Sequence, residues 1–222
     1  MASWAVAIID AKRHPGLDPG SQTLEIVQLL FATLNPGKQL EIKKLLADTG
    51  VHLVFPQDVN LLDLKVDETG QTFAQNSALK ATAFGLKSGL LTAADDSGLE
   101  ISSLDNFPGV KSDRWLKGTW EEKNLGILEK LNGKTNRQAR FVTNICLFDP
   151  QTQELKHFVG TILGNIADQK KGQQGFGYDP IFIPEGETRT WGELGPEAKN
   201  QHSHRQQALK ALHEYMSKAL NE

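Results

Sequence analysis

Two adjacent aspartates, Asp95 and Asp96, follow the apolar start of the segment LTAADDSGLEI (residues 91–101). The apolar residues predict a buried strand that ends at the pair, and Gly98 allows the chain to turn directly afterwards. Neighbouring carboxylates repel each other, and their removal from water increases that cost. The pair therefore belongs either to a polar turn or to a site that holds a cation or receives a proton.

A second candidate is the segment TLNPGK (residues 33–38), which lies between a predicted strand and a predicted helix. Backbone N–H groups at a helix start and the positive end of the helix dipole favour an anion, and Lys38 adds a positive charge. The spacing differs from that of a Walker A loop. On its own, such a turn is more often structural than functional.

Glu68 and a glycine-rich aromatic segment are further candidates. Glu68, in DETG (residues 67–70), is either a metal ligand or a solvated acid ahead of a helix. In GQQGFGYDPIF (residues 172–182), glycines around Phe176 and Tyr178 let the backbone approach a flat ligand on which a ring can stack. Asp179 is held extended by the proline that follows it. A tight aromatic turn explains this second pattern equally well.

The segment KNQHSHRQQA (residues 199–208) places four residues around a predicted helix start, namely Lys199, His202, His204 and Arg205. Cations reduce stability beside the positive end of a helix dipole unless they face an anion. Local anion binding is therefore at least as good an explanation as a polar surface.

Alternating strands and helices are expected to position these residues. Strands are predicted over residues 24–33, 51–55, the stretch that leads to Asp96, 139–150 and 155–166. Helices are predicted over residues 39–50, 73–89, 120–133 and from 204 onward, with capping signals at Thr72, Thr119 and Ser203. Strands and helices alternate early and a hairpin comes late, so the fold class is α/β with a mixed sheet.

The composition is that of a globular protein, with 222 residues, 39% hydrophobic and 23% charged. The net charge of −3 argues against a general affinity for nucleic acid polymers or for an anionic membrane. Cys146 is the only cysteine, which excludes an internal disulfide and a Cys-based zinc site and favours a cytoplasmic location. Residues 1–21 are expected to form a flexible N-terminal extension, and residues 22–222 the folded domain.

Six motifs, in order, resemble those of the inosine triphosphate pyrophosphatase family. They are FATLNPGKQLEIKKLL, DETGQTFAQNSALKA, ADDSGLEI with FPGVKS, RQARF, GFGYDPIF and KNQHSHRQQAL. The resemblance implies an elongated central sheet flanked by helices, in two lobes with the active-site cleft between them. It also implies a homodimer that uses Mg²⁺ to hydrolyse ITP, dITP and XTP to the monophosphate and pyrophosphate. The chain departs from the family pattern at Leu34, Lys111 and Asp113, which affects substrate preference rather than the reaction.

The resemblance also implies roles for individual residues. Glu68 and Asp96 correspond to the metal ligands, with Asp96 also the catalytic base and Asp95 in support. Phe176 corresponds to the aromatic residue that stacks on the base, and Asp179 lies near the base edge. His204 and Arg205 correspond to the residues that read the 6-oxo group of the purine. The other residues expected to contact the substrate are Thr33, Leu34, Asn35, Pro36, Gly37, Lys38, Ser97, Gly177, Tyr178 and Lys199, with Lys80 a further candidate.

Two other functions are compatible with the same residues. A septum-related nucleotide pyrophosphatase of similar architecture would share the metal ligands and read a different base. A non-catalytic nucleotide sensor would bind without turnover and would not need an acid at the position of Asp96.

Overall fold

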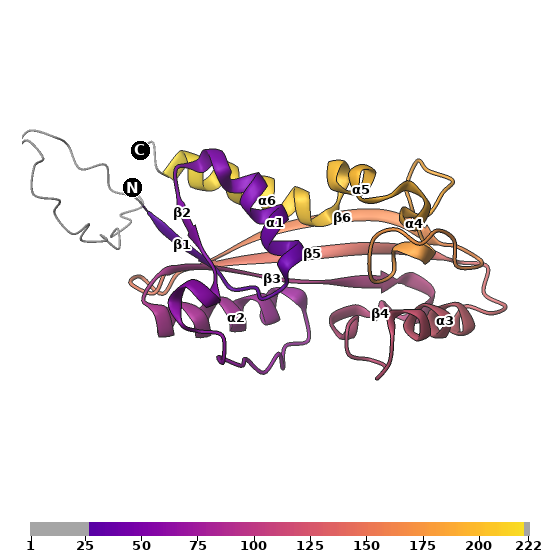
Figure 1. Cartoon of the computed structure of the whole chain (residues 1–222). Coiled ribbons are helices and arrows are strands. Elements are labelled where there is room, and N and C mark those ends of the chain that lie inside the picture. The colour runs from indigo at the N-terminus through magenta and orange to yellow at the C-terminus, as the bar shows by residue number, and fades with distance from the viewer. Residues whose placement is uncertain (1–26, 220–222) are drawn as a thin grey trace, which may run out of the picture.

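The structure is a computed structural model, and it describes residues 27–219 (Figure 1). In this part of the chain one seven-stranded sheet has the order β2-β1-β3-β5-β6-β7, and β4 pairs with β3 off this path. The strands are β1 (Gln28–Phe31), β2 (His52–Val54), β3 (Leu91–Ile101), β4 (Phe107–Pro108), β5 (Gln138–Phe148), β6 (Leu155–Ile166) and β7 (Phe182–Pro184). β1 is parallel to β2 and β3, whereas the other pairs are antiparallel. The predicted α/β class with a mixed sheet is confirmed.

Three predicted capping residues stand directly before helices, and the described part of the chain has six α-helices in all. They are α1 (Pro36–Leu46), α2 (Phe73–Ser88), α3 (Trp120–Lys130), α4 (Trp191–Leu194), α5 (Pro196–His202) and α6 (His204–Ala219). Thr72 and Thr119 form capping boxes at the starts of α2 and α3, and the Ser203 hydroxyl accepts a hydrogen bond from the backbone N–H of Gln206. These side chains satisfy N–H groups that a helix start leaves without an intrahelical partner.

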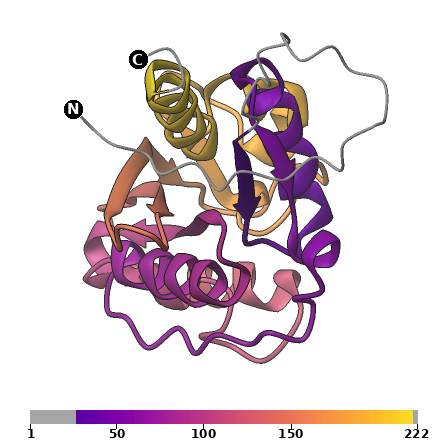
Figure 2. The same ribbon diagram turned by 90° about the vertical axis from the view of Figure 1, so that its left-hand side faces the viewer.

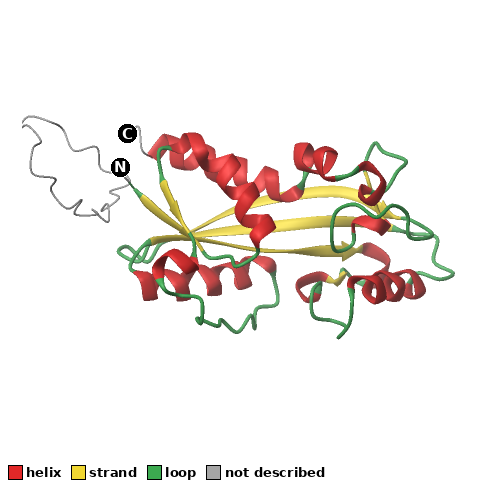
Figure 3. Cartoon of the chain, viewed as in Figure 1, coloured by secondary structure: helices red, strands yellow, loops and turns green. Residues whose placement is uncertain are grey.

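Helices cover both faces of the elongated sheet (Figures 1 and 3). An end-on view shows α6 and α1 on one side of the strands and α2 on the other (Figure 2). Apolar residues of α1 and α6 pack on one face of β1, β3 and β5, and those of α2 pack on the opposite face. We call this end of the molecule the first lobe. The second lobe is a separate core at the far end of β3, β5 and β6, where α3, β7 and α4 pack.

One prediction about the central strand was wrong. The double aspartate does not end β3, because β5 pairs with β3 continuously from Thr92 to Ile101. Gly98 continues the strand instead of turning the chain. A β-carbon at this position would lie 2.4 Å from the Ser112 hydroxyl and 2.5 Å from the Gly109 carbonyl oxygen. Glycine is therefore needed here for close packing and not for a turn.

The other boundaries differ from the predictions by a few residues. The strand predicted over residues 24–33 is β1, and the first residues of that range lie outside the described part of the chain. The helix predicted from residue 39 begins at Pro36, because the Asn35 side chain caps it there. The predicted N-terminal extension, residues 1–21, also lies outside the described residues. Within residues 27–219, no helix is both long enough and apolar enough to cross a membrane.

Candidate active site

A cavity of about 880 Å³ lies between the two lobes and collects most of the predicted site residues. The predicted residues that line it are Asn35, Gly37, Lys38, Glu68, Lys80, Asp96, Ser97, Phe176, Gly177, Tyr178, Asp179, Lys199, His204 and Arg205. Thr33, Leu34 and Pro36 belong to the same predicted set but are not part of the lining. Residues distant in sequence therefore meet at one cleft, as the motif order had implied.

The start of α1 forms one wall of this cavity. The Asn35 Oδ1 atom accepts hydrogen bonds from the backbone N–H groups of Gly37 (2.9 Å) and Lys38 (3.2 Å). The Thr33 hydroxyl accepts one from the backbone N–H of Asn35 at 3.3 Å. The first N–H groups of the helix are thus already satisfied by its own cap. An anion at this wall would be attracted by the Lys38 ammonium group more than by open backbone groups.

Asp95 points toward the α1 and α6 face of the sheet. Its Oδ2 atom lies 2.7 Å from Lys38 Nζ and 3.8 Å from Arg205 Nε, and Arg205 Nη1 lies 3.1 Å from Glu41 Oε2. Burial alone would raise the pKa of the Asp95 carboxyl, but Lys38, Arg205 and Lys80 outweigh burial and hold this pKa well below its usual range. Asp95 is therefore a buried anion that anchors two cations of the cavity wall.

Asp96 points toward the opposite face, which α2 covers. Successive residues of a strand face opposite sides of a sheet, so the two adjacent carboxylates are separated by the strand itself. Asp96 Oδ1 lies 3.6 Å from Lys80 Nζ, and Asp96 Oδ2 accepts a hydrogen bond of 3.1 Å from Asn76 Nδ2. Burial, assisted by Glu68 and Asp95, raises the pKa of Asp96 despite the opposing effects of Lys80 and Asn76. A raised pKa suits a carboxylate that accepts a proton.

Glu68 and Asp96 offer suitable ligands for a hard divalent cation. Lys80 Nζ lies 2.9 Å from Glu68 Oε1 and 3.6 Å from Asp96 Oδ1, so the two carboxylates already converge on one positive charge. The described residues contain no group of three or more His, Cys, Asp or Glu side chains that could hold a metal. Two carboxylates nevertheless fit Mg²⁺, which commonly completes its shell with water and substrate phosphates.

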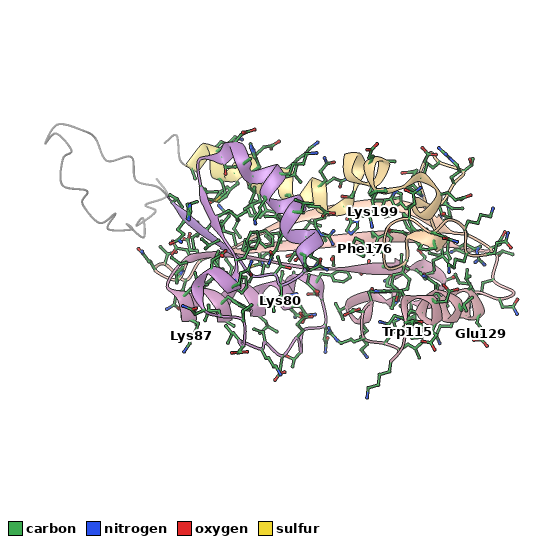
Figure 4. All side chains as sticks on the ribbon, viewed as in Figure 1. Lys80, Lys87, Trp115, Glu129, Phe176 and Lys199 are labelled. Atoms are coloured by element: carbon green, nitrogen blue, oxygen red, sulfur yellow. The ribbon has the colours of Figure 1, made fainter. Side chains whose placement is uncertain are left out.

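The other end of the cavity is aromatic, and Phe176 and Lys199 lie beside each other there (Figure 4). Phe176 is 52% exposed and lines the cavity, so part of its ring is accessible to a flat ligand. Lys199 Nζ lies 4.2 Å from the centre of this ring and 2.7 Å from both carboxylate oxygens of Asp179. The expected contact of Lys199 with the substrate stays a prediction, because here its ammonium group is paired with Asp179.

His204 and Arg205, at the start of α6, line the cavity from the sheet side. The His204 ring stacks on Phe141, with 4.9 Å between ring centres. Burial, reinforced by Arg205 and Lys199, holds the pKa of His204 well below its usual range, so the ring is neutral at pH 7. His204 Nδ1 and Arg205 Nε are buried and have no hydrogen-bond partner among the described residues. A polar ligand in the cavity would satisfy such groups.

Several residues of the site were missed in the sequence. Trp120 and Arg114 line the cavity, and Arg114 Nη1 contacts Glu68 Oε2 at 3.0 Å. Asn76 is fully buried, and its amide joins Asp96 to the backbone N–H of Gly70 at 2.8 Å. Asn76 lies four residues before Lys80 on α2, so helical periodicity could have placed it on the same face. Nothing in the local sequence indicates that Arg114 reaches Glu68.

The chain is similar to known proteins over most of its length. A dITP/XTP pyrophosphatase of Deinococcus deserti is 44% identical over 186 residues, which cover 83% of this chain and 87% of that protein. A dITP/XTP pyrophosphatase from an Exiguobacterium species is 44% identical over 192 residues, which cover 84% of this chain and 95% of that protein. The structure of a HAM1 protein from Coxiella burnetii superposes with a TM-score of 0.83 at 34% identity, covering 87% of this chain and all of that one.

The match to the family as a whole is equally extensive. The model of the Ham1 family matches residues 29–215, from the second residue of β1 to the last part of α6. This range contains every predicted site residue, and the relatives' names agree with the motif resemblance. The chain therefore belongs to the Ham1 family.

Proposed function

We propose that this protein hydrolyses the non-standard purine nucleoside triphosphates dITP, XTP and ITP to the monophosphate and pyrophosphate. The observation that carries the proposal is the division of one cavity into two chemical ends. Glu68 and Asp96 lie at the acidic end, and the open ring of Phe176 lies at the aromatic end. A nucleotide has the same division, with its phosphates at one end and a flat base at the other. The names of the relatives, dITP/XTP pyrophosphatases, support the same substrates.

At the acidic end, Glu68 and Asp96 would hold Mg²⁺. When bound, Mg²⁺ supplies positive charge for the phosphate oxygens and polarises the attacking water. Asp96 accepts the proton of this water, whose oxygen forms a bond to the α-phosphorus. The bond from that phosphorus to the bridging oxygen then breaks, and pyrophosphate leaves. Lys80 contacts both carboxylates, Lys38 also lines the cavity, and the two cations would balance the charge of the phosphates.

At the aromatic end, Phe176 would stack on the purine, and His204 and Arg205 would recognise its 6-oxo group. Support comes from His204 Nδ1 and Arg205 Nε, which are buried and have no hydrogen-bond partner among the described residues. Hypoxanthine and xanthine present an acceptor at C6, whereas adenine presents an amino donor. A donor that faces this amino group stays unpaired, and an unsatisfied buried group costs about 1–3 kcal/mol.

We also propose a homodimer that works in the cytoplasm. The homodimer rests on the family resemblance. The location rests on Cys146, a single buried thiol, since reducing compartments keep such thiols free. Size-exclusion chromatography with light scattering would test the homodimer. A measured mass equal to that of one chain would contradict it.

The reaction is tested by product analysis with a panel of nucleotides and Mg²⁺. We expect ITP, dITP and XTP to be hydrolysed much faster than ATP or GTP, with monophosphate and pyrophosphate as products. Orthophosphate with a diphosphate as products, or equal rates on ATP, would contradict the proposal. Binding of ITP without turnover would indicate a nucleotide sensor, and turnover of another base would indicate a different pyrophosphatase.

A further inference from the structure

Glu68 forms ion pairs with two cationic side chains, one from each lobe. Its Oε1 atom lies 2.9 Å from Lys80 Nζ, and its Oε2 atom lies 3.0 Å from Arg114 Nη1. Arg114 Nη2 also donates to the backbone carbonyl oxygen of Glu68 at 3.1 Å. Lys80 belongs to α2 in the first lobe, whereas Arg114 precedes Trp115, which packs in the core of the second lobe. Arg114 therefore ties the segment of Glu68 across the cleft.

The two cations differ in how easily they can be displaced. The Lys80 side chain is 17% exposed and contacts both Glu68 and Asp96, so its removal would leave Asp96 without its nearest cation and Glu68 with Arg114 alone. The Arg114 side chain is 45% exposed, so a released guanidinium group is rehydrated. A divalent cation that binds Glu68 would thus displace Arg114 at the lower cost.

We propose that Arg114 is a positioning residue that competes with the divalent cation for Glu68. Without the divalent cation, Arg114 holds the Glu68 carboxylate in the cleft. Cation binding breaks the Arg114–Glu68 ion pair, which links the two lobes. The inference rests on the proposed function, because that function assigns Glu68 as a metal ligand. Its particular consequence is that loss of Arg114 strengthens cation binding, whereas loss of a merely structural residue would weaken it.

The test is a titration of the full-length protein with Mn²⁺, followed by electron paramagnetic resonance without nucleotide. We expect Arg114→Gln to bind Mn²⁺ about two- to fivefold more tightly, the range expected for a half-exposed ion pair. Lys117→Gln is the matched control, since it removes the same charge from an exposed position on the same segment. Its Mn²⁺ affinity should match the wild type. Unchanged affinity in Arg114→Gln, or equal tightening in both variants, would overturn the competition.

Two further measurements separate this inference from the metal assignment itself. Glu68→Gln should weaken Mn²⁺ binding strongly, and an unchanged affinity would overturn Glu68 as a ligand and with it the proposed metal site. If Glu68→Gln binds Mn²⁺ weakly but Arg114→Gln does not bind it more tightly than the wild type, the competition is overturned and the metal site is kept. Amide hydrogen exchange of residues 109–117 should become faster when Mn²⁺ is added to the wild type. In Arg114→Gln the exchange of these residues should already be fast without Mn²⁺. Exchange in the wild type that does not change when Mn²⁺ is added would contradict the release of Arg114.

Discussion

Asp95 and Asp96 are adjacent in the sequence but have different partners in the structure. Asp95 is 3% exposed and is the counter-ion of Lys38 and Arg205, on one face of the sheet. Asp96 meets Lys80 and Asn76 on the other face and lines the cavity. Their repulsion is tolerable because each has its own partners on its own side of β3.

Neutralising the two aspartates should therefore have different results. Asp96→Asn removes the proposed base, so we expect kcat to fall by about 10²–10⁴ with little change in stability. Asp95→Asn leaves the half-buried Lys38 without its ion-pair partner and the buried Arg205 with Glu41 alone, so the free energy of unfolding should fall by about 3–5 kcal/mol. Denaturant unfolding and kcat with ITP measure both effects.

Either of two outcomes would contradict this division. A stable Asp96→Asn protein with nearly wild-type kcat would exclude Asp96 as the base. An Asp95→Asn protein as stable as the wild type would show that the two cations do not need their anion.

At the scale of elements, the start of α6 packs closely against β6, because the residue of β6 that it contacts is the glycine Gly160. This close packing places the start of α6 at the cavity. A β-carbon on Gly160 would lie 2.8 Å from the backbone nitrogen of Ala208 and even closer to the carbonyl oxygen of His204. Both of these atoms are backbone, so side-chain rotation cannot relieve the clash. The position of His204 and Arg205 therefore depends on Gly160.

Gly160→Ala should push α6 away from the sheet. We expect the free energy of unfolding to fall by about 1–3 kcal/mol, as is typical of overpacking. The preference for ITP over ATP should narrow as well, because His204 and Arg205 move with the helix. Val159→Ala, at the exposed neighbouring position on the other face, is the control and should change stability by less than about 0.5 kcal/mol. Unaltered stability in Gly160→Ala would show that α6 adjusts freely.

At the scale of the whole molecule, the cavity places titratable side chains such as His204 in the interior. The free energy of unfolding therefore depends on pH. His204 is 4% exposed, and burial with Arg205 and Lys199 nearby keeps its pKa well below the usual value. Below a pH of about 6.5 the unfolded chain binds a proton at this residue that the folded protein does not bind. Stability is therefore lost as the pH falls below that value.

His204→Phe should remove this contribution while keeping a ring stacked on Phe141. Between pH 7 and pH 5, the wild type should lose up to about 2 kcal/mol more unfolding free energy than the variant does. Urea unfolding of both proteins at the two pH values measures the difference. Identical pH dependence of the two proteins would mean that His204 takes up a proton in the folded state.

Much of the fold and most of the site can be predicted from the sequence. Capping residues such as Thr72 and Thr119 act on backbone groups two or three residues away, so they mark helix starts reliably. Strand alternation and the late hairpin establish the mixed α/β class. The motif resemblance groups residues from Asn35 to Arg205 into one set, and most of this set lines a single cavity.

Only the tertiary structure reveals which partners these residues have. The pairing of β3 with β5 carries the strand through the double aspartate, which local apolarity placed at its end. Ion pairs such as Lys38–Asp95 and Arg114–Glu68 join residues 57 and 46 positions apart. Coulombic and hydrogen-bond energies depend on distances in space, and a local pattern carries no information about contacts made across such separations. For this reason the type of each site residue was predictable, whereas the ion it faces, its burial and its protonation were decided by the fold.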